Sequence, residues 1–268
     1  MARNGFGQLA CGAALAALLA GCSTAPDVRS ASETVPTAAD GWAAAWVWAV
    51  VSAEMSAVLR DWIWAVVSAA ICSFPSIEAA VRTTIQTIQI GVPIARVELI
   101  DHHTVRRVNA HSKLNLREEP MLLMEFHGSP ASVKEQAEMV QDIASEFGGQ
   151  AFEWATTPEE RTRLWTARHN AYFAAVQSRP GCRAISTDTC VPISRLADCL
   201  LESVDEVEAS GIPYFLVGHV GDGNFHFGYL IDPNSAEERT KAEAMNHTLV
   251  ARALSMGGTC TGEHGVGI

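Results

Sequence analysis

Two strand-like runs that meet at an Asp-Gly pair constrain the fold of this chain more than any other feature. The runs span residues 212–231, and Asp222-Gly223 lies between them in the segment GHVGDGNFH. Asp-Gly between such runs is the strongest short-range signal for a two-residue β-hairpin. With that loop, His219 is predicted to face His226 on one side of the sheet, with Cβ atoms ~4.5–5.5 Å apart. The other side is predicted to face the core, because its residues are apolar: Leu216, Val220, Phe225, Phe227 and Tyr229.

The chain upstream of this hairpin alternates between helical and strand-like patterns. Ser76 is predicted to cap the first helix, and Ser129-Pro130 to open another. Strands are expected at residues 95–100, 120–126 and 184–191 and near Phe152, and helices at residues 76–90, 130–147, 158–176, 193–209 and 235–256. A hydrophobic content of 48% with 18% charged residues excludes a disordered chain. We therefore predict the α+β class, as a ferredoxin-like sandwich whose mainly antiparallel sheet has helices packed on one face.

The first 65 residues differ from the rest. Residues 1–22 are typical of an export signal, because an apolar run too short to span a bilayer ends in a lipobox-like Leu-Ala-Gly-Cys. Cys22 is then the predicted lipidation site, and a chance Ala/Leu-rich start is the alternative. Residues 23–65 combine a polar linker with a Trp-rich segment. Residues 46–53 of this segment recur as residues 62–69, so the second copy continues past residue 65. That repeat is either an interfacial amphipathic segment or non-native sequence.

Charge and cysteine content exclude several classes of partner and site. The formal net charge is −11, from 30 acidic and 19 basic residues, and no basic stretch is longer than Arg106-Arg107. We therefore expect no nucleic-acid partner. Seven cysteines, an odd number without a Cys-x-x-Cys pair, argue against a disulfide scaffold and against a Cys-based zinc site.

The predicted histidine pair indicates a metal site. Two imidazoles at that spacing can share one divalent ion, and two partly exposed strand histidines are the alternative. The segment GGTCTGEHGVG, residues 257–267, follows the last predicted helix. Its Glu263 can complete a His-His-carboxylate ligand set, and His264 offers a free imidazole suited to proton abstraction near neutral pH. The alternative for this segment is a glycine-rich loop with surface charges.

A helical arginine is the third candidate group. Arg168 lies on the predicted helix over residues 158–176 and can bind a carboxylate through two parallel hydrogen bonds. An ordinary exposed helix arginine is the alternative.

Four segments together resemble one known family. GHVGDGNFH, GGTCTGEHGVG, LWTARHNAYFAA and STDTCVPIS are similar to the C-terminal substrate domain of flavin-linked 2-hydroxyacid dehydrogenases. This family includes cytochrome-type D-lactate dehydrogenases, the glycolate oxidase D subunit and D-2-hydroxyglutarate dehydrogenase. The resemblance covers residues 66–268 and implies the cofactor FAD, held in a separate N-terminal domain. It also implies oxidation of D-lactate to pyruvate, or of a related small 2-hydroxyacid, with electrons passed to a cytochrome or quinone.

The same resemblance implies a role for each candidate residue. The ligands of a zinc or manganese ion, which polarises the substrate hydroxyl, correspond to His219, His226 and Glu263. His264 corresponds to the base that takes the hydroxyl proton while hydride leaves for the flavin. Arg168 corresponds to the clamp for the substrate carboxylate, and Asn224 to a contact with the substrate or the metal shell.

The chain departs from the family pattern at both ends. Residues 1–65 do not resemble an FAD-binding domain, and the sequence stops at Ile268, directly after the Glu-His motif. We therefore expect a separate FAD-domain subunit as a partner. A metal-binding lipoprotein and an inactive fragment of this domain are the alternatives. The lipobox predicts a membrane-associated protein anchored through Cys22, whereas the family predicts the cytoplasmic side of the inner membrane.

Overall fold

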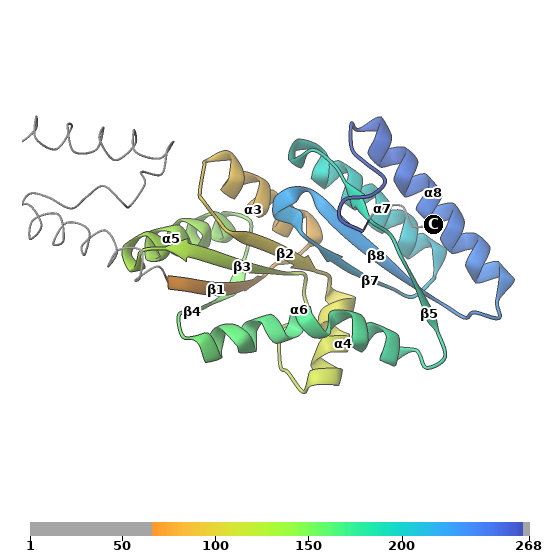
Figure 1. The fold of residues 1–268 in the computed structure, drawn as a ribbon, viewed down its shortest axis with the longest axis horizontal. Coiled ribbons are helices and arrows are strands. Elements are labelled where there is room, and N and C mark those ends of the chain that lie inside the picture. Colours follow the sequence, from red (N-terminus) through yellow and green to blue (C-terminus); the bar gives the residue numbers. More distant parts are fainter. Residues whose placement is uncertain (1–65, 265–268) are drawn as a thin grey trace, which may run out of the picture. The chain divides into compact units, whose positions relative to one another are not determined.

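The computed structural model describes residues 66–264, whose helices and strands are labelled in Figure 1. Cys22, the predicted export signal, the linker and the first Trp-rich copy lie outside the described residues. The elements in chain order are β1 (Val66–Ser73), α3 (Ile77–Gln89), β2 (Arg96–Ile100), α4 (His102–Ser112), β3 (Met121–Gly128), α5 (Pro130–Glu146), β4 (Gln150–Ala155), α6 (Pro158–Ser178), β5 (Arg183–Ser186), β6 (Thr189–Cys190), α7 (Leu196–Ser210), β7 (Tyr214–Gly218), β8 (Asn224–Ile231) and α8 (Ala236–Ser255). No helix between residues 66 and 264 is long and apolar enough to cross a membrane.

The strands form one sheet in the order β4-β1-β3-β2-β7-β8-β5, and β6 pairs with β8 beside β5. Every pairing among them is antiparallel. The first four strands, with α3 and α5 as crossovers, have the β4-β1-β3-β2 order of a ferredoxin-like unit. The predicted α+β class with a mainly antiparallel sheet is confirmed.

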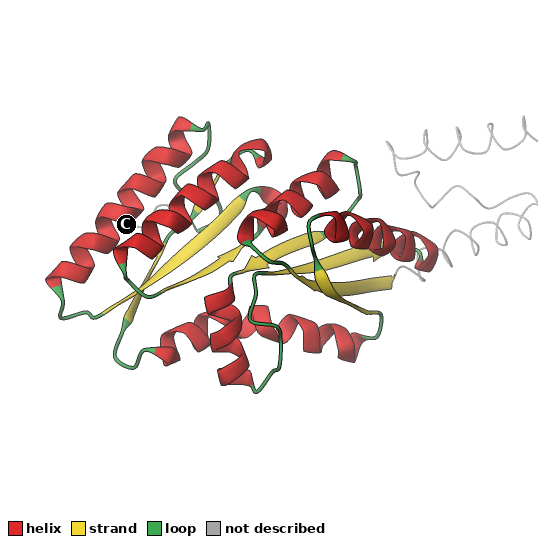
Figure 2. Ribbon diagram, turned by 180° about the vertical axis from the view of Figure 1, so that it is seen from behind, coloured by secondary structure: helices red, strands yellow, loops and turns green. Residues whose placement is uncertain are grey.

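Helices cover both faces of the sheet, and this corrects the expectation that they pack on one face only. Helices α3, α5, α7 and α8 pack on one face, and α4 and α6 pack on the other (Figures 1 and 2). Strand β3 shows why the second layer is needed. Leu122 and Met124 belong to the first core, whereas Met121 and Leu123 belong to the second. A strand that is apolar on both sides requires cover on both faces.

Strand β1 has no counterpart among the predicted elements. It pairs with β3 from Val66 to Ser73 and with β4 on its other edge. Ala70 and Ile71 are both buried, one in each core. The second copy of the Trp-rich repeat therefore ends inside a central strand, because its small and β-branched residues suit a position buried on both sides. Residues 66–69 of the second copy are part of the folded domain, and the two interpretations of the Trp-rich segment before residue 66 stay predictions.

The predicted helix starts are confirmed by their caps. The Ser76 hydroxyl accepts a hydrogen bond from the Ala79 amide at 3.1 Å, and the Ser129 hydroxyl accepts one from the Ser132 amide at 3.3 Å. These bonds satisfy amide groups that have no partner within the first helical turn. Pro130 occupies the first turn of α5, where its missing N–H removes no helical bond.

The hairpin between β7 and β8 differs from the predicted two-residue loop. Val217 pairs with His226, so the register is shifted by two residues. A short 3-10 turn over Val220–Asp222 makes the connection, and Gly223 follows it in the left-handed region with φ of 78°. A Cβ on Gly223 would lie 2.1 Å from the Val191 carbonyl oxygen, which explains the need for glycine here. The five apolar residues predicted to face the core are all buried: Leu216, Val220, Phe225, Phe227 and Tyr229.

Candidate active site

His219 and His226 lie side by side although the predicted loop between them is wrong. His219 directly follows β7 and begins the short turn, whereas His226 lies within β8. The turn folds the His219 ring back over β8, so that the ring centroids are 5.8 Å apart at an angle of 84°. The two histidines are thus neighbours, as predicted, although the backbone between them follows a different path.

The Glu263 carboxylate completes this cluster. Its Oε1 atom lies 3.2 Å from His219 Nε2 and 3.1 Å from His226 Nε2. The Nε2 atom of His264 lies 3.3 Å from the same oxygen. One ligand atom each from His219, His226 and Glu263 can be chosen so that all lie within 4.8 Å of one another. The three residues named as a ligand set from the sequence therefore converge on one point.

Each ring of the histidine pair has a hydrogen-bond partner at its Nδ1 atom. His219 Nδ1 lies 2.6 Å from Glu98 Oε1, and His226 Nδ1 lies 3.0 Å from the Thr187 carbonyl oxygen. Because a carboxylate and a carbonyl oxygen only accept, we assign the proton to Nδ1 in both neutral rings. Both Nε2 lone pairs then point toward Glu263. His226 Nε2 is buried and makes no hydrogen bond within the described residues.

These environments shift the two histidine pKa values in opposite directions. The hydrogen bond to Glu98 raises the pKa of His219, and the nearby Glu98 charge adds to this effect. Burial lowers the pKa of His226, so that this ring favours its neutral form. A neutral imidazole is the form that can ligate a metal.

Glu98 also links the cluster to Arg168. It is only 1% exposed on β2, and its Oε2 accepts a hydrogen bond from Arg168 Nε at 2.9 Å. Arg96 Nε lies 3.1 Å from Oε1, and its guanidinium stacks 4.9 Å above the Trp165 ring centre. Burial alone raises the pKa of Glu98, but the His219 hydrogen bond and the Arg168 charge outweigh it and lower the pKa. Sequence reasoning missed Glu98, although a glutamate within an otherwise buried strand was a usable signal.

Asp188 anchors the segment that carries Glu263 and His264. Its Oδ2 atom accepts hydrogen bonds from the backbone amides of Glu263 at 2.9 Å and His264 at 2.8 Å. It also accepts one from the Thr261 hydroxyl at 3.1 Å. Burial raises the pKa of Asp188, but these bonds outweigh burial and lower it. The expected strand over residues 184–191 is divided here into β5 and β6, and the break turns Asp188 toward the site.

Asn224 lies behind the cluster. It is 5% exposed, and its Nδ2 donates to Asp188 Oδ1 at 3.0 Å. A Cβ atom on Gly262 would lie 1.7 Å from this Nδ2 atom, so the loop backbone presses directly against the Asn224 amide. The structure thus places Asn224 next to the loop, and it is not among the residues that line the cavity described next.

Two cavities meet at Glu263. The larger, of about 810 Å³, is lined by Arg168, His226 and His264 together with apolar side chains that include Phe215 and Val250. The smaller, of about 480 Å³, is lined by His219 and Arg96. The His264 side chain is 66% exposed, and that of Arg168 is 21% exposed. A small anion in the larger cavity can therefore reach a guanidinium, an imidazole and the ligand cluster at once.

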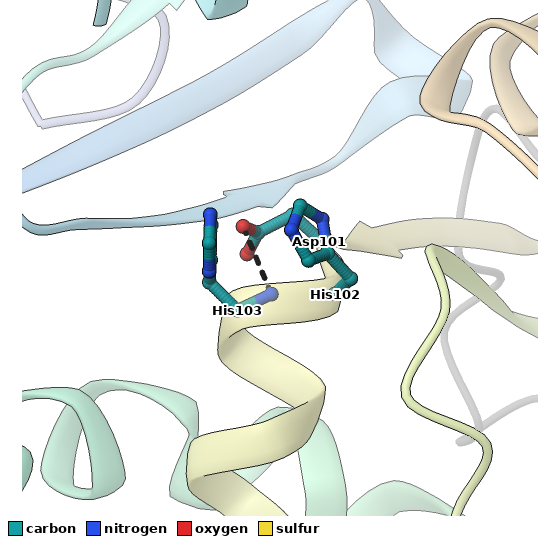
Figure 3. Close-up of side chains that lie close together, drawn as sticks. All are labelled: Asp101, His102 and His103. Carbon is teal, nitrogen blue, oxygen red and sulfur yellow. Dashed lines mark hydrogen bonds between the residues drawn. The ribbon is translucent and has the colours of Figure 1, made fainter. Parts of the chain in front are cut away.

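A second group of metal-binding residue types has a different explanation. Figure 3 shows Asp101, His102 and His103 close together at the start of α4, with the Asp101 carboxylate bonded to the His103 backbone amide. Asp101 is fully buried as the N-cap of α4, and it also accepts hydrogen bonds from the amides of Thr104 and Leu216. Its carboxylate is committed to joining α4 to β7. The positive end of the α4 dipole also disfavours a cation at this place.

Comparison with known families matches most of the chain to one domain family. The sequence profile described as "FAD linked oxidases, C-terminal domain" matches residues 64–268. The chain belongs to the FAD-linked oxidase family. The candidate active-site residues, together with Glu98 and Asp188, lie within the matched range.

Relatives of this chain include proteins named D-lactate dehydrogenase and glycolate oxidase subunits. The chain is 46% identical over 199 residues to a probable mitochondrial D-lactate dehydrogenase of Danio rerio, covering 74% of the chain and 40% of the relative. It is 44% identical over 198 residues to the mitochondrial D-lactate dehydrogenase (cytochrome) of Arabidopsis thaliana, covering 74% and 35%. Glycolate oxidase subunit GlcD of Bacillus subtilis is 29% identical over 197 residues, covering 72% and 41%. The chain therefore spans less than half the length of these relatives.

Solved structures share the fold of this chain. The 4-ethylphenol oxidase from Gulosibacter chungangensis matches with a TM-score of 0.53 at 14% identity, covering 72% of the chain and 44% of that structure. p-Cresol methylhydroxylase matches with a TM-score of 0.50 at 13% identity and the same coverage. At such low identity the likeness shows the fold alone.

Proposed function

We propose that this chain is the substrate- and metal-binding half of a flavin-dependent dehydrogenase that oxidises D-lactate, or a related small D-2-hydroxyacid. One observation carries the proposal: the His219, His226 and Glu263 ligand atoms lie within 4.8 Å of one another, at a cavity that Arg168 and His264 also line. The relatives named D-lactate dehydrogenase, at up to 46% identity, support the choice of substrate.

The chemistry of the cluster fits a divalent ion. His219, His226 and Glu263 would hold it, with zinc or manganese suited to this donor set. The buried His226 Nε2, which has no hydrogen-bond partner within residues 66–264, is the group that an ion would satisfy. A bound divalent ion supplies Lewis-acid chemistry, which lowers the pKa of a hydroxyl group next to it. The Nδ1 contacts of both histidines match the outer hydrogen bonds that orient metal-binding imidazoles.

Arg168 and His264 provide the remaining functions. Arg168 uses Nε–H for Glu98, which leaves its terminal N–H groups free to bind the substrate carboxylate from the cavity wall. His264 is exposed at the other side of Glu263, where its imidazole can accept the proton of the 2-hydroxyl group. Together they would orient the hydroxyacid with its two polar ends fixed, which selects one face of C2 for hydride loss.

FAD, held by a separate domain or subunit, supplies the hydride acceptor when it is bound. The larger cavity is open, and about 810 Å³ exceeds the need of a three-carbon acid. A cavity larger than the substrate fits a site that a second domain or subunit covers. We propose a cytochrome or quinone as the onward electron acceptor, as the resemblance implies.

The test is a titration of the full-length chain with Mn²⁺, followed by electron paramagnetic resonance. We expect one tightly bound ion, and a change in its spectrum when D-lactate is added but not when L-lactate is added. Binding of no ion by the chain would overturn the proposed metal centre. Equal responses to both lactates would overturn the substrate assignment while leaving the metal centre intact.

We propose a lipid anchor at Cys22 as the means of membrane association, because the motif at residues 19–22 closes a signal-like apolar run. Labelling with radioactive palmitate, with Cys22→Ser as the control, tests this. We expect label on the wild type only, and an unlabelled wild type would favour the cytoplasmic side of the inner membrane.

A further inference from the structure

Glu98 contacts the groups proposed to hold the two ends of the substrate. Its Oε1 accepts from His219 Nδ1 at 2.6 Å, and its Oε2 accepts from Arg168 Nε at 2.9 Å. The side chain is 1% exposed and lies on β2 in the interior of the sheet. A buried carboxylate is costly unless each oxygen has a partner, and here each oxygen has one.

The bond to His219 selects the tautomer of that ring. A carboxylate at Nδ1 requires a hydrogen on Nδ1, which leaves the Nε2 lone pair directed at Glu263. The opposite tautomer would place a hydrogen on Nε2, where it blocks ligation. Glu98 therefore controls whether His219 is able to act as a ligand.

The bond to Arg168 selects the orientation of the guanidinium. With Nε–H bonded to Glu98, the terminal nitrogens remain for a ligand in the larger cavity, which Arg168 lines. A planar guanidinium that donates its Nε–H to a buried carboxylate binds a second ligand through its two terminal nitrogens. The same carboxylate thus fixes the direction of the proposed substrate clamp.

We infer that Glu98 is a positioning residue that orients both the metal ligand His219 and the substrate clamp Arg168. This inference rests on the proposed function for the identity of the two ligands. A single rigid carboxylate between them holds the metal-binding atom and the carboxylate-binding fork at a fixed separation. A fixed separation suits a 2-hydroxyacid, which carries its hydroxyl and carboxyl groups on adjacent carbons.

The variant Glu98→Gln tests the inference in the full-length chain. Gln keeps the shape but has one acceptor oxygen, so its amide N–H₂ must face either His219 or Arg168. We expect Mn²⁺ affinity to fall about 10–100-fold, the usual effect of losing an outer hydrogen bond to a ligand. We also expect weaker D-lactate binding. Arg168→Lys should weaken D-lactate binding alone, because it leaves the bond between Glu98 and His219 in place.

Glu208→Gln is the matched control. Glu208 also accepts from a histidine, His103 at 3.1 Å, and from the Tyr214 hydroxyl at 2.7 Å, but it lies outside the candidate site. We expect this variant to bind Mn²⁺ and D-lactate like the wild type. Glu98→Asp, which restores two acceptor oxygens, should recover part of the lost affinity, and it serves if Glu98→Gln does not fold.

A readout that does not depend on metal separates this inference from the proposed function. In the ¹⁵N spectrum of the metal-free chain, His219 should carry its proton on Nδ1, and Glu98→Gln should move it to Nε2. An unchanged tautomer together with unchanged Mn²⁺ affinity and unchanged D-lactate binding would overturn the role of Glu98. If the wild type binds no Mn²⁺, the metal centre fails, but the tautomer measurement still decides whether Glu98 orients His219.

Discussion

The proposed ligand in the β-sheet and the proposed ligand in the glycine-rich loop are held in place by different means. His226 lies in β8, where every residue is buried and antiparallel partners fix the register. Glu263 lies in a segment without regular structure, and its backbone amide is bonded to Asp188. The sheet positions His226 through many packing contacts, whereas the Glu263 backbone is held by one carboxylate. The comparison predicts that the position of Glu263 is the more sensitive to changes outside the ligands themselves.

Removal of a sheet ligand should give the largest effect. His226→Ala removes a buried imidazole whose Nε2 has no hydrogen-bond partner among the described residues, so nothing replaces it as a ligand. We expect Mn²⁺ affinity to fall by more than about 100-fold, beyond the range for an outer-shell contact. Isothermal titration measures this. His127→Ala, which removes an exposed histidine paired with Glu125, is the control and should bind like the wild type. Unchanged metal stoichiometry in His226→Ala would remove His226 from the ligand set.

Removal of the loop anchor should give the second largest effect. Asp188→Ala takes the acceptor from the amides of Glu263 and His264 and from the Thr261 hydroxyl. We expect about 10–100-fold weaker Mn²⁺ binding, because the loop must then be ordered at the moment of binding. Hydrogen exchange at the Glu263 and His264 amides should quicken as well.

Asp188→Asn gives a graded version of the same experiment. The Asn side chain can keep one acceptor oxygen toward the loop. The Mn²⁺ affinity of this variant should therefore lie between those of the wild type and Asp188→Ala. The control is Asp232→Asn, because Asp232 likewise accepts a hydrogen bond from a backbone amide, that of Asn234 at 2.9 Å, and lines neither of the two cavities. Wild-type affinity and exchange rates in Asp188→Ala would contradict the idea that the loop depends on this carboxylate.

The sequence predicted the parts of the site that come from residue type and missed the parts that come from the path of the chain. His219, His226 and Glu263 could be named because their side chains have few other uses in such a pattern. The register of the hairpin could not, because Asp222-Gly223 is compatible with a two-residue loop and with a 3-10 turn, and Val220 faces the core in either case. The turn also depends on a contact from elsewhere in the chain, the hydrogen bond that the Val191 amide donates to the Gly223 carbonyl oxygen at 3.0 Å.

Glu98 and Asp188 are further residues that the sequence alone could not place at the site. Glu98 lies 121 positions from His219 in the sequence, and Asp188 lies 75 positions from Glu263. No local pattern connects residues so distant. The sheet order, which brings β2 next to β7, puts Glu98 behind His219, and the bridge between Cys190 and Thr259 brings Asp188 to the segment that carries Glu263.

Gly262→Ala should give the smallest effect, and it tests how tightly the loop is packed. A Cβ at this position would lie 1.7 Å from Asn224 Nδ2, closer than any real contact, so either the loop or the Asn224 amide must move. The amide is held by its bond to Asp188, so we expect the loop to move and Mn²⁺ affinity to fall several-fold, less than for Asp188→Ala.

A double-mutant cycle makes this last experiment decisive. Asn224→Ala removes the group that the new Cβ meets, so Gly262→Ala should cost less in that background than in the wild type. A coupling of this sign would place the constraint in the contact between loop and sheet. Additive effects would instead assign the loss to the backbone of Gly262 itself, and the loop would then be limited by its own conformational freedom more than by what it packs against.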